Sequence, residues 1–337
     1  MKNWAFCLVA SAALGVTRAQ SGAPDADHFD LERPELRAFI DHAVEHGGLE
    51  RKRVVALLRK AVPQPKILDA MAKPAEKVTP WWQYRAHFLT EERISAGLEF
   101  WRAHREALDH IAAERGVAPE YLVAIIGVET LYGRSMGRYR VLDALATLAF
   151  SYPPRADFFS GELEQFLLLT REESIDPLTA MGSYAGAMGA AQFMPSSYRR
   201  YAIDENGDGR RDLWSQWDDV LASIANFLRE KGWEPGAAVL AEASVEPDAN
   251  FVADPTNLEL NETVDSLHTQ GVDFQAPLQG SAPAILIPAE QEAGPSYRVG
   301  FRNFYVITRY NRSLRYAMAV YDLASALDAR IAQAPPG

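Results

Sequence analysis

Tyr121 to Gly133, with the sequence YLVAIIGVETLYG, is the stretch that decides the fold and the chemistry of this chain. It is an apolar run of helical length with a single carboxylate, Glu129. Pro119 suits the first turn of a helix and Gly133 suits the position just after its end. If the run is helical, one face carries Glu129 together with residues three, four or seven positions away, namely Leu122, Ile125, Ile126 and Tyr132.

A carboxylate on the buried stripe of a helix loses water, and this loss raises its pKa. A glutamic acid in such a place can hold its proton near neutral pH and then donate it, as a general acid must. The alternative is that Glu129 faces solvent or pairs with Arg134 or Arg138, since structural ion pairs are also common.

The whole chain has 337 residues, of which 48% are hydrophobic, and a formal net charge of -11. This length suits about two domains of roughly 150 residues each. The acidic balance argues against nucleic acid as a partner, because phosphate contacts need a basic face.

The first residues, MKNWAFCLVASAALGVTRAQ, have the pattern of an export signal. Lys2 supplies the positive charge, Ala5 to Val16 the apolar segment, and Thr17 to Ala19 the cleavage site. The apolar segment is too short to span a membrane. The only cysteine, Cys7, comes too early to be a lipid-attachment residue. We therefore expect a signal peptide at 1–19, a linker at 20–30 and a periplasmic protein without a membrane span.

Helical patterns fill most of the remaining chain and predict a mainly α fold. We expect an N-terminal helical domain at 31–115, a catalytic core at 116–235, a small β-rich segment at 236–303 and a C-terminal return to the core at 304–333. Within the first domain, Thr90 to Arg115 is expected to be one long helix. TPWWQY, from Thr79 to Tyr84, is expected to be a proline-bounded turn that is either a core plug or an aromatic platform for a sugar.

Two further motifs follow the central stretch. Met181 to Tyr198, MGSYAGAMGAAQFMPSSY, is rich in small residues, so its backbone can approach a ligand closely. Gln192 is its one long polar side chain and either lies on the surface of a packed loop or faces a sugar. Asp204 to Asp212, DENGDGRRD, matches the first half of a calcium loop, but Ser215 stands where the closing glutamate belongs. A plain acidic turn is the alternative.

His42 to His46, HAVEH, matches the spacing of an inverted zinc-protease motif. The histidines stand beside polar residues just before a glycine pair. We therefore expect a solvated helix end and no metal.

Four motifs together resemble one known family: IIGVETLYGR, GSYAGAMGAAQFMPSSY, DENGDGRRDLW and ITRYNRSLRYAMAVY. Their order and spacing, from about Phe29 to Ala332, are similar to the lytic murein transglycosylase B family, glycoside hydrolase family 103. The resemblance implies a lysozyme-like helical core with a helical N-terminal domain and a small β-containing segment. It also implies cleavage of the β-1,4 bond between N-acetylmuramic acid and N-acetylglucosamine, which leaves a 1,6-anhydro ring.

The resemblance further implies roles for individual residues. Glu129 matches the single catalytic acid and base. The residues that match saccharide-binding positions are Tyr84, Arg155, Ser183, Gln192, Tyr310 and Asn311. The residues that match a calcium-type loop are Asp204, Asn206, Asp208, the carbonyl of Arg210, and Asp219, with Asp218 as the alternative to Asp219.

The expected partner is the peptidoglycan glycan strand, with cell-wall synthesis or hydrolase proteins as further candidates. We expect a monomer that needs no cofactor for catalysis and holds at most a structural calcium ion. A lysozyme-type hydrolase on the same scaffold is the alternative enzyme. A non-catalytic peptidoglycan- or calcium-binding protein is the alternative from another class.

Overall fold

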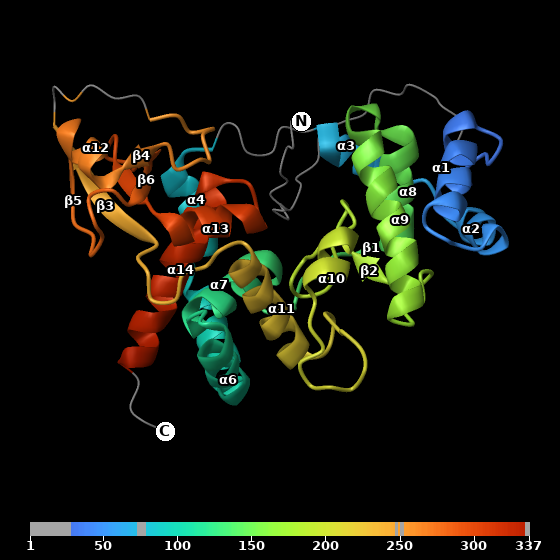
Figure 1. Ribbon diagram of the computed structural model, residues 1–337, viewed down its shortest axis with the longest axis horizontal. Coiled ribbons are helices and arrows are strands. Elements are labelled where there is room, and N and C mark those ends of the chain that lie inside the picture. Colours follow the sequence, from blue (N-terminus) through green and yellow to red (C-terminus); the bar gives the residue numbers. More distant parts are fainter. Residues whose placement is uncertain (1–27, 73–78, 247–248, 250–252, 334–337) are drawn as a thin grey trace. The chain divides into compact units, whose positions relative to one another are not determined.

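The computed structural model describes residues 28–72, 79–246, 249 and 253–333 (Figure 1). The predicted signal peptide and most of the predicted linker lie outside these residues. The described chain divides into two compact units. One unit comprises Glu76–Arg134 and Trp217–Gly337 in their described residues, and the other comprises Leu8–Ala75 and Ser135–Gln216. The domain boundaries expected from the sequence stay a prediction.

The unit that contains Glu129 combines a set of helices with one sheet. Its longest helix packs along the helix that carries Glu129. The helices are α4 (Trp81–Phe88), α5 (Glu91–Ala103), α6 (Arg105–Arg115), α7 (Pro119–Thr130), α11 (Trp217–Glu230), α12 (Val264–Thr269), α13 (Arg302–Tyr310) and α14 (Leu314–Ala332).

Helix α7 is apolar on nearly every side because it lies in the interior of its unit. Val123, Ile125 and Ile126 have no exposed surface. Their β-branched side chains cost about 0.5 kcal/mol each in helix propensity relative to alanine. Burial contributes about 1.5–3 kcal/mol for each such side chain, so packing decides the conformation of this stretch.

The end of α7 differs from the expectation. The helix ends at Thr130 instead of continuing to Gly133, because Leu131, Tyr132 and Gly133 all have positive φ, at 50°, 59° and 81°. The amide of Leu131 donates to the carbonyl of Gly127, and that of Tyr132 donates to the carbonyl of Ile126. Tyr132 therefore leaves the helix and folds back over it, instead of sharing a helical face with Glu129.

The predicted β-rich segment is confirmed as a five-stranded antiparallel sheet in the order β4-β6-β7-β3-β5. Its apolar face packs around Leu286, Val299 and Phe301. The strands are β3 (Leu240–Val245), β4 (Glu262–Thr263), β5 (Val272–Phe274), β6 (Pro283–Pro288) and β7 (Tyr297–Gly300).

The second unit is built around a pair of packed helices, α8 and α9, shown in green in Figure 1. A two-stranded antiparallel ribbon of β1 and β2 pairs Tyr139 with Gly182. The elements are α1 (Pro34–Glu45), α2 (Arg51–Leu58), α3 (Pro65–Ala72), β1 (Tyr139–Arg140), α8 (Val141–Ser151), a 3₁₀ turn η1 (Pro153–Arg155), α9 (Ala156–Glu172), β2 (Met181–Gly182) and α10 (Pro195–Tyr201).

Two local expectations were wrong, although the mainly α fold class is confirmed. Trp81 to Tyr84 is not a turn but the first half of α4. Pro80 occupies the N-cap, where its missing N–H breaks no hydrogen bond within the helix, so the helix can begin at Trp81. The expected single helix from Thr90 to Arg115 is divided at His104, whose backbone leaves the helical region at φ -118° and ψ 23°. No helix in the described part of the chain is long and apolar enough to cross a membrane.

Candidate active site

Glu129 is the second-last residue of α7, and the left-handed turn at Leu131 and Tyr132 follows directly after the helix. The residue keeps part of its surface exposed, while its helical neighbours are buried. Its carboxyl Oε1 accepts a hydrogen bond of 2.7 Å from the hydroxyl of Tyr316 on α14. The arginines considered as partners are engaged elsewhere, since Arg134 pairs with Glu99 and Arg138 lies over the ring of Tyr139.

Burial raises the pKa of Glu129 to about 7, and the hydrogen bond from Tyr316 opposes this rise. Loss of water penalises the charged form of a carboxyl group, whereas a donated hydrogen bond favours it. Desolvation is the larger of the two effects here. Glu129 can thus carry its proton at neutral pH and give it up without a large free-energy penalty, which suits a group that acts first as acid and then as base.

Tyr316 is the residue that sequence reasoning missed. It is buried, and Ser313 caps the start of its helix by accepting from the Tyr316 amide. Tyr316 belongs to the quoted motif ITRYNRSLRYAMAVY, yet it lies 187 positions from Glu129 in the sequence. No periodicity within either helix indicates that the two side chains meet. The serine N-cap is the one local signal, since it predicts where α14 begins and so which face Tyr316 occupies.

Tyr310 and Asn311, at the end of α13, lie in the same unit as Glu129. The Tyr310 ring is parallel to that of Tyr316, with centroids 6.4 Å apart, and meets Phe227 edge-on. Burial raises the pKa of Tyr310, and the charge of Glu129 raises it further. Tyr310 therefore remains neutral at neutral pH. Asn311 is buried at the helix end.

Tyr84 lies deep in the helical part of the same unit. It is 6% exposed, and its ring contacts Trp81 and Phe88. This burial favours a core residue over an open aromatic platform, because little of the ring surface is left for a sugar.

Ser183 follows β2 in the other unit and is buried. Its Oγ accepts hydrogen bonds from the amides of Ala185 and Ala187, at 3.3 and 3.0 Å. Because both contacts use the hydroxyl as an acceptor, its proton stays available for donation.

Gln192 has a left-handed backbone, with φ of 50°, which is uncommon for a residue other than glycine. Its Nε2 donates to the carbonyl oxygens of Met136 and Gly189, at 3.2 and 2.9 Å. Both partners are acceptors, so the amide nitrogen must face them and the carbonyl oxygen must face away. Strained residues of this kind cluster at functional sites. The structure thus holds the Gln192 amide on a packed loop with its carbonyl oxygen oriented as an acceptor, and contact with a sugar stays a prediction.

Arg155 forms the end of η1 and is half-buried in the same unit as Ser183. Its guanidinium lies over the ring of Phe158 at 4.1 Å and that of Phe159 at 5.2 Å. Burial lowers its pKa. The aromatic contacts fix the cation in one orientation, as binding of an anionic group requires.

The acidic loop has the internal hydrogen bonds of a calcium-type loop. Asp204 accepts from the amides of Asp208 and Gly209, and Asp208 accepts from the amide of Arg210. Gly209 has φ of 86°, as the sharp turn at this position requires. The side chains of Asp204, Asn206 and Asp208 are hard oxygen donors and fit calcium chemically. Asp219 is buried in the first turn of α11, in the other unit.

The pattern that defines the transglycosylase SLT domain family matches residues 32–325. This chain belongs to that family. The membrane-bound lytic murein transglycosylase B of Escherichia coli is 41% identical over 303 residues, which are 87% of this chain and 82% of that protein. The enzyme class is thus that of a lytic transglycosylase.

Solved structures of lytic transglycosylases have the same fold. The catenated lytic transglycosylase SltB1 of Pseudomonas aeruginosa aligns with a TM-score of 0.85 at 42% identity, over 88% of this chain and 98% of that one. The Escherichia coli lytic transglycosylase Slt35 in complex with calcium aligns with a TM-score of 0.81 at 40% identity, over 91% and 96% of the two chains. The predicted family and lysozyme-like fold class are confirmed.

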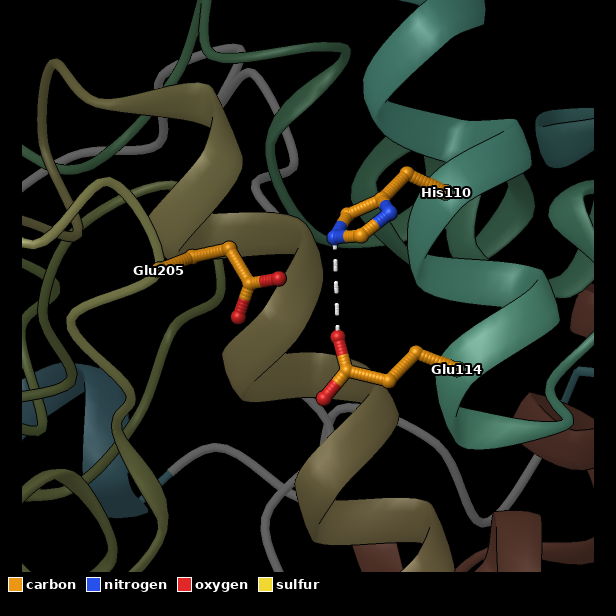
Figure 2. A group of neighbouring side chains, drawn as sticks. All are labelled: His110, Glu114 and Glu205. Atoms are coloured by element: carbon orange, nitrogen blue, oxygen red, sulfur yellow. Dashed lines mark ion pairs between the residues drawn. The ribbon is translucent and has the colours of Figure 1, made fainter.

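Outside its family motifs, the transglycosylase carries two histidine groups that resemble metal sites. His42 Nδ1 lies 3.4 Å from Glu164 Oε2, and its ring stacks on that of His46. Both histidines are exposed at the end of α1, as expected for a solvated helix end, and the absence of a metal there stays a prediction. On α6, His110 Nε2 pairs with Glu114 Oε2 at 3.6 Å (Figure 2). Glu205, also drawn there, belongs to the other unit, so we assign no metal site to the three.

Proposed function

We propose that this transglycosylase cleaves the β-1,4 bond between N-acetylmuramic acid and N-acetylglucosamine in murein and closes a 1,6-anhydro ring on the muramic sugar. The observation that supports this proposal is the state of Glu129. It is an acid with a pKa of about 7 that accepts a hydrogen bond from Tyr316. We infer the substrate, murein, from the family and from the relatives that this chain resembles.

In the proposed mechanism, protonated Glu129 donates its proton to the glycosidic oxygen as the bond to the anomeric carbon breaks. The acetamido carbonyl of the muramic sugar stabilises the anomeric centre. The Glu129 carboxylate then takes the proton of the C6 hydroxyl, whose oxygen bonds to the anomeric carbon. The hydroxyl belongs to the same sugar, and this proximity favours its attack over that of water.

One carboxyl group suffices for this sequence. Two-carboxylate glycosidases hold their acids about 5–9 Å apart, and charges at such distances influence each other's pKa. The shift of Glu129 has only burial and the Tyr316 hydrogen bond as its causes, and no second carboxylate among the described residues contributes to it. The family match and the relative of known activity favour the transglycosylase over a hydrolase with a carboxylate nucleophile.

The remaining site residues are proposed to hold the sugars. Ser183 offers a hydroxyl proton and Gln192 an oriented carbonyl oxygen, which together suit the amide and hydroxyl groups of an N-acetylated sugar. Tyr310 and Asn311 are proposed to face the reacting centre, and Arg155 to bind an acidic group of the substrate. Tyr84 is proposed to support the groove from the core.

The products test the function directly. Purified protein is expected to release muropeptides from isolated sacculi that end in anhydro sugars, each lighter by one water than a hydrolase product. Mass spectrometry of the released material checks this. Products with free reducing ends would identify a lysozyme-type hydrolase. Binding to sacculi without any released muropeptide would identify a binding protein.

We further propose that the Asp204–Asp212 loop binds a structural calcium ion. The ligands within the unit that carries the loop would be Asp204, Asn206, Asp208 and the Arg210 carbonyl. Asp219, which lies in the other unit, stays a prediction from the sequence. The hydrogen bonds that Asp204 and Asp208 accept from the loop amides support this, as does the relative solved with calcium. The ion would stabilise the fold and take no part in the reaction.

Calcium is expected to raise the melting temperature. At about 100 times its Kd, a ligand of the native state adds about 2.7 kcal/mol. Differential scanning calorimetry in calcium and in EDTA measures the increment. Asp208→Asn keeps an acceptor for the Arg210 amide but removes a charge, so it should lose most of the increment. Equal melting temperatures of the wild type in calcium and in EDTA would contradict the site.

The substrate and the N-terminal sequence together support a periplasmic location, which is part of the same proposal. Murein lies outside the cytoplasmic membrane, so its enzyme must be exported. The pattern of residues 1–19 supplies an export signal. Cell-wall synthesis or hydrolase proteins remain proposed partners.

A further inference from the structure

A cavity of about 360 Å³ opens in the unit that carries Ser183. This volume falls within the range of small-molecule sites. One wall is the segment from Glu173 to Met181, which joins α9 to β2, and the opposite wall runs from Arg210 to Trp214, where the calcium-type loop ends. Tyr198 also lines the cavity. None of the functions proposed so far uses this cavity.

The two arginines of the cavity are in different states. Arg211 donates to Glu173, a buried carboxylate, and to the carbonyl of Arg199. Arg210 is exposed, and no carboxylate in the described part of the chain forms an ion pair with its guanidinium. Arg211 is therefore part of the wall, whereas Arg210 can bind an anionic group.

The cavity is also lined by a carboxylate and by apolar side chains. Asp176 is exposed, and its Oδ1 accepts from the amide of Leu178. Trp214 is held by a hydrogen bond of 3.0 Å from Nε1 to the carbonyl of Met181, and its ring lies 5.8 Å from that of Tyr198. Met181 is 40% exposed, an unusual exposure for a large apolar residue in this protein. An occupant with a carboxylate, an amino group and aliphatic carbons would match all of these groups.

The cavity adjoins the backbone of the small-residue motif. Met181 lines it, and Ser183 is two residues further along the chain, so their Cα atoms lie at most about 7 Å apart. The opposite wall is tied to the same motif, because the amide of Ala190 donates to the carbonyl of Leu213 at 2.7 Å. The backbone that borders the cavity therefore continues, two residues on, into the residue proposed to bind the muramic sugar.

We propose that this cavity binds the peptide stem of murein, with Arg210 on a stem carboxylate and Trp214 and Met181 against its aliphatic carbons. The inference rests on the proposed function. Stems are attached to the muramic sugar and carry carboxylate, amino and aliphatic groups. An extended stem of four residues reaches up to about 14 Å, about twice the largest separation of the Cα atoms of Ser183 and the lining residue Met181. The cavity thus distinguishes stem-bearing glycan from bare glycan.

Arg210→Ala tests the inference on two substrates, sacculi with stems and glycan strands stripped of stems by an amidase. The substitution keeps the backbone carbonyl that the calcium loop uses. We expect kcat/KM on stem-bearing glycan, divided by kcat/KM on stem-free glycan, to fall about fivefold. This is the effect of losing one partly exposed hydrogen bond between charged groups. Arg210→Lys should restore part of the ratio. Arg200→Ala, which removes an exposed arginine outside the cavity, should leave the ratio unchanged.

Binding of the free stem peptide, released from murein by the amidase, supplies a readout that needs no turnover. Calorimetric titration should show binding to the wild type and about fivefold weaker binding to Arg210→Ala. An unchanged ratio, or an equal loss on both glycans, overturns the inference. If neither glycan is cleaved but the stem peptide binds the wild type more tightly than Arg210→Ala, the proposed function is wrong. The cavity would still be a site for the stem peptide.

Discussion

Glu129→Gln is expected to abolish turnover while retaining binding to murein. General acid or base catalysis contributes about 10²- to 10⁴-fold, and one group that serves both steps should lie at the upper end, about 10⁴-fold. This loss corresponds to about 5.5 kcal/mol of transition-state stabilisation. The amide keeps the shape of the side chain and can still accept from Tyr316. Release of muropeptides from sacculi measures the loss, and sedimentation with sacculi measures the retained binding.

The same substitution should stabilise the protein above neutral pH. Burial raises the pKa of Glu129 from 4.5 to about 7, so the native state holds the proton more tightly than the unfolded chain does. The stability linked to this proton is fully present below pH 4.5 and is lost as the pH rises to about 7. Removing the charge should therefore raise the unfolding free energy at pH 8 by about 1–3 kcal/mol. Thermal unfolding at pH 5 and pH 8 compares the two proteins.

Tyr316→Phe is the matched control, because it keeps the acid and removes only the hydrogen bond. That bond favours the charged form, so its loss should raise the pKa of Glu129 further and shift the alkaline limb of kcat/KM to higher pH. Turnover should survive in this variant. A Glu129→Gln protein that clears sacculi at a rate near that of the wild type would refute the assignment of the acid.

The sequence predicted the environment of Glu129 because helical periodicity is a local property. An apolar helix with one carboxylate places that carboxylate among apolar neighbours when it packs into the interior. The sequence could not predict Tyr316 as its hydrogen-bond donor, since that contact depends on how α14 packs along α7. The turn from Asp204 to Gly209 was predictable for the same reason as α7, because its aspartates and glycines form a local pattern, while calcium binding stays a prediction.

Other features depended on packing and escaped prediction. Gly133 was expected to end the helix, but the chain leaves it at Leu131, whose positive φ no local pattern predicts. Trp81 and Tyr84 were expected in a turn because prolines and aromatics often bound one. The cavity beside Trp214 brings together two segments more than thirty residues apart, from Met181 to Trp214. Neither segment alone indicates a binding site.

Gly127→Ala is expected to destabilise the protein by about 1 kcal/mol, although alanine is the better helix former by about 1 kcal/mol. A Cβ at this position would lie 2.6 Å from the Tyr132 hydroxyl and 2.8 Å from its Cζ, too close for real atoms. The ring cannot move away easily, because it stacks on Phe100 at 5.6 Å and its other side meets Gly97. Overpacking of about 1–3 kcal/mol or more thus outweighs the gain in propensity.

The same change should impair catalysis, because Tyr132 belongs to the turn that follows Glu129. A displacement of about 1 Å at a reacting group can reduce the rate about 10²-fold. Gly161→Ala on α9 is the matched control, since its Cβ would meet nothing within 4 Å. It should stabilise the protein by about 0.5–1 kcal/mol and leave turnover unchanged. Urea unfolding and muropeptide release compare the two variants. Equal stability of both would mean that the Tyr132 ring yields freely and does not hold the end of α7 in place.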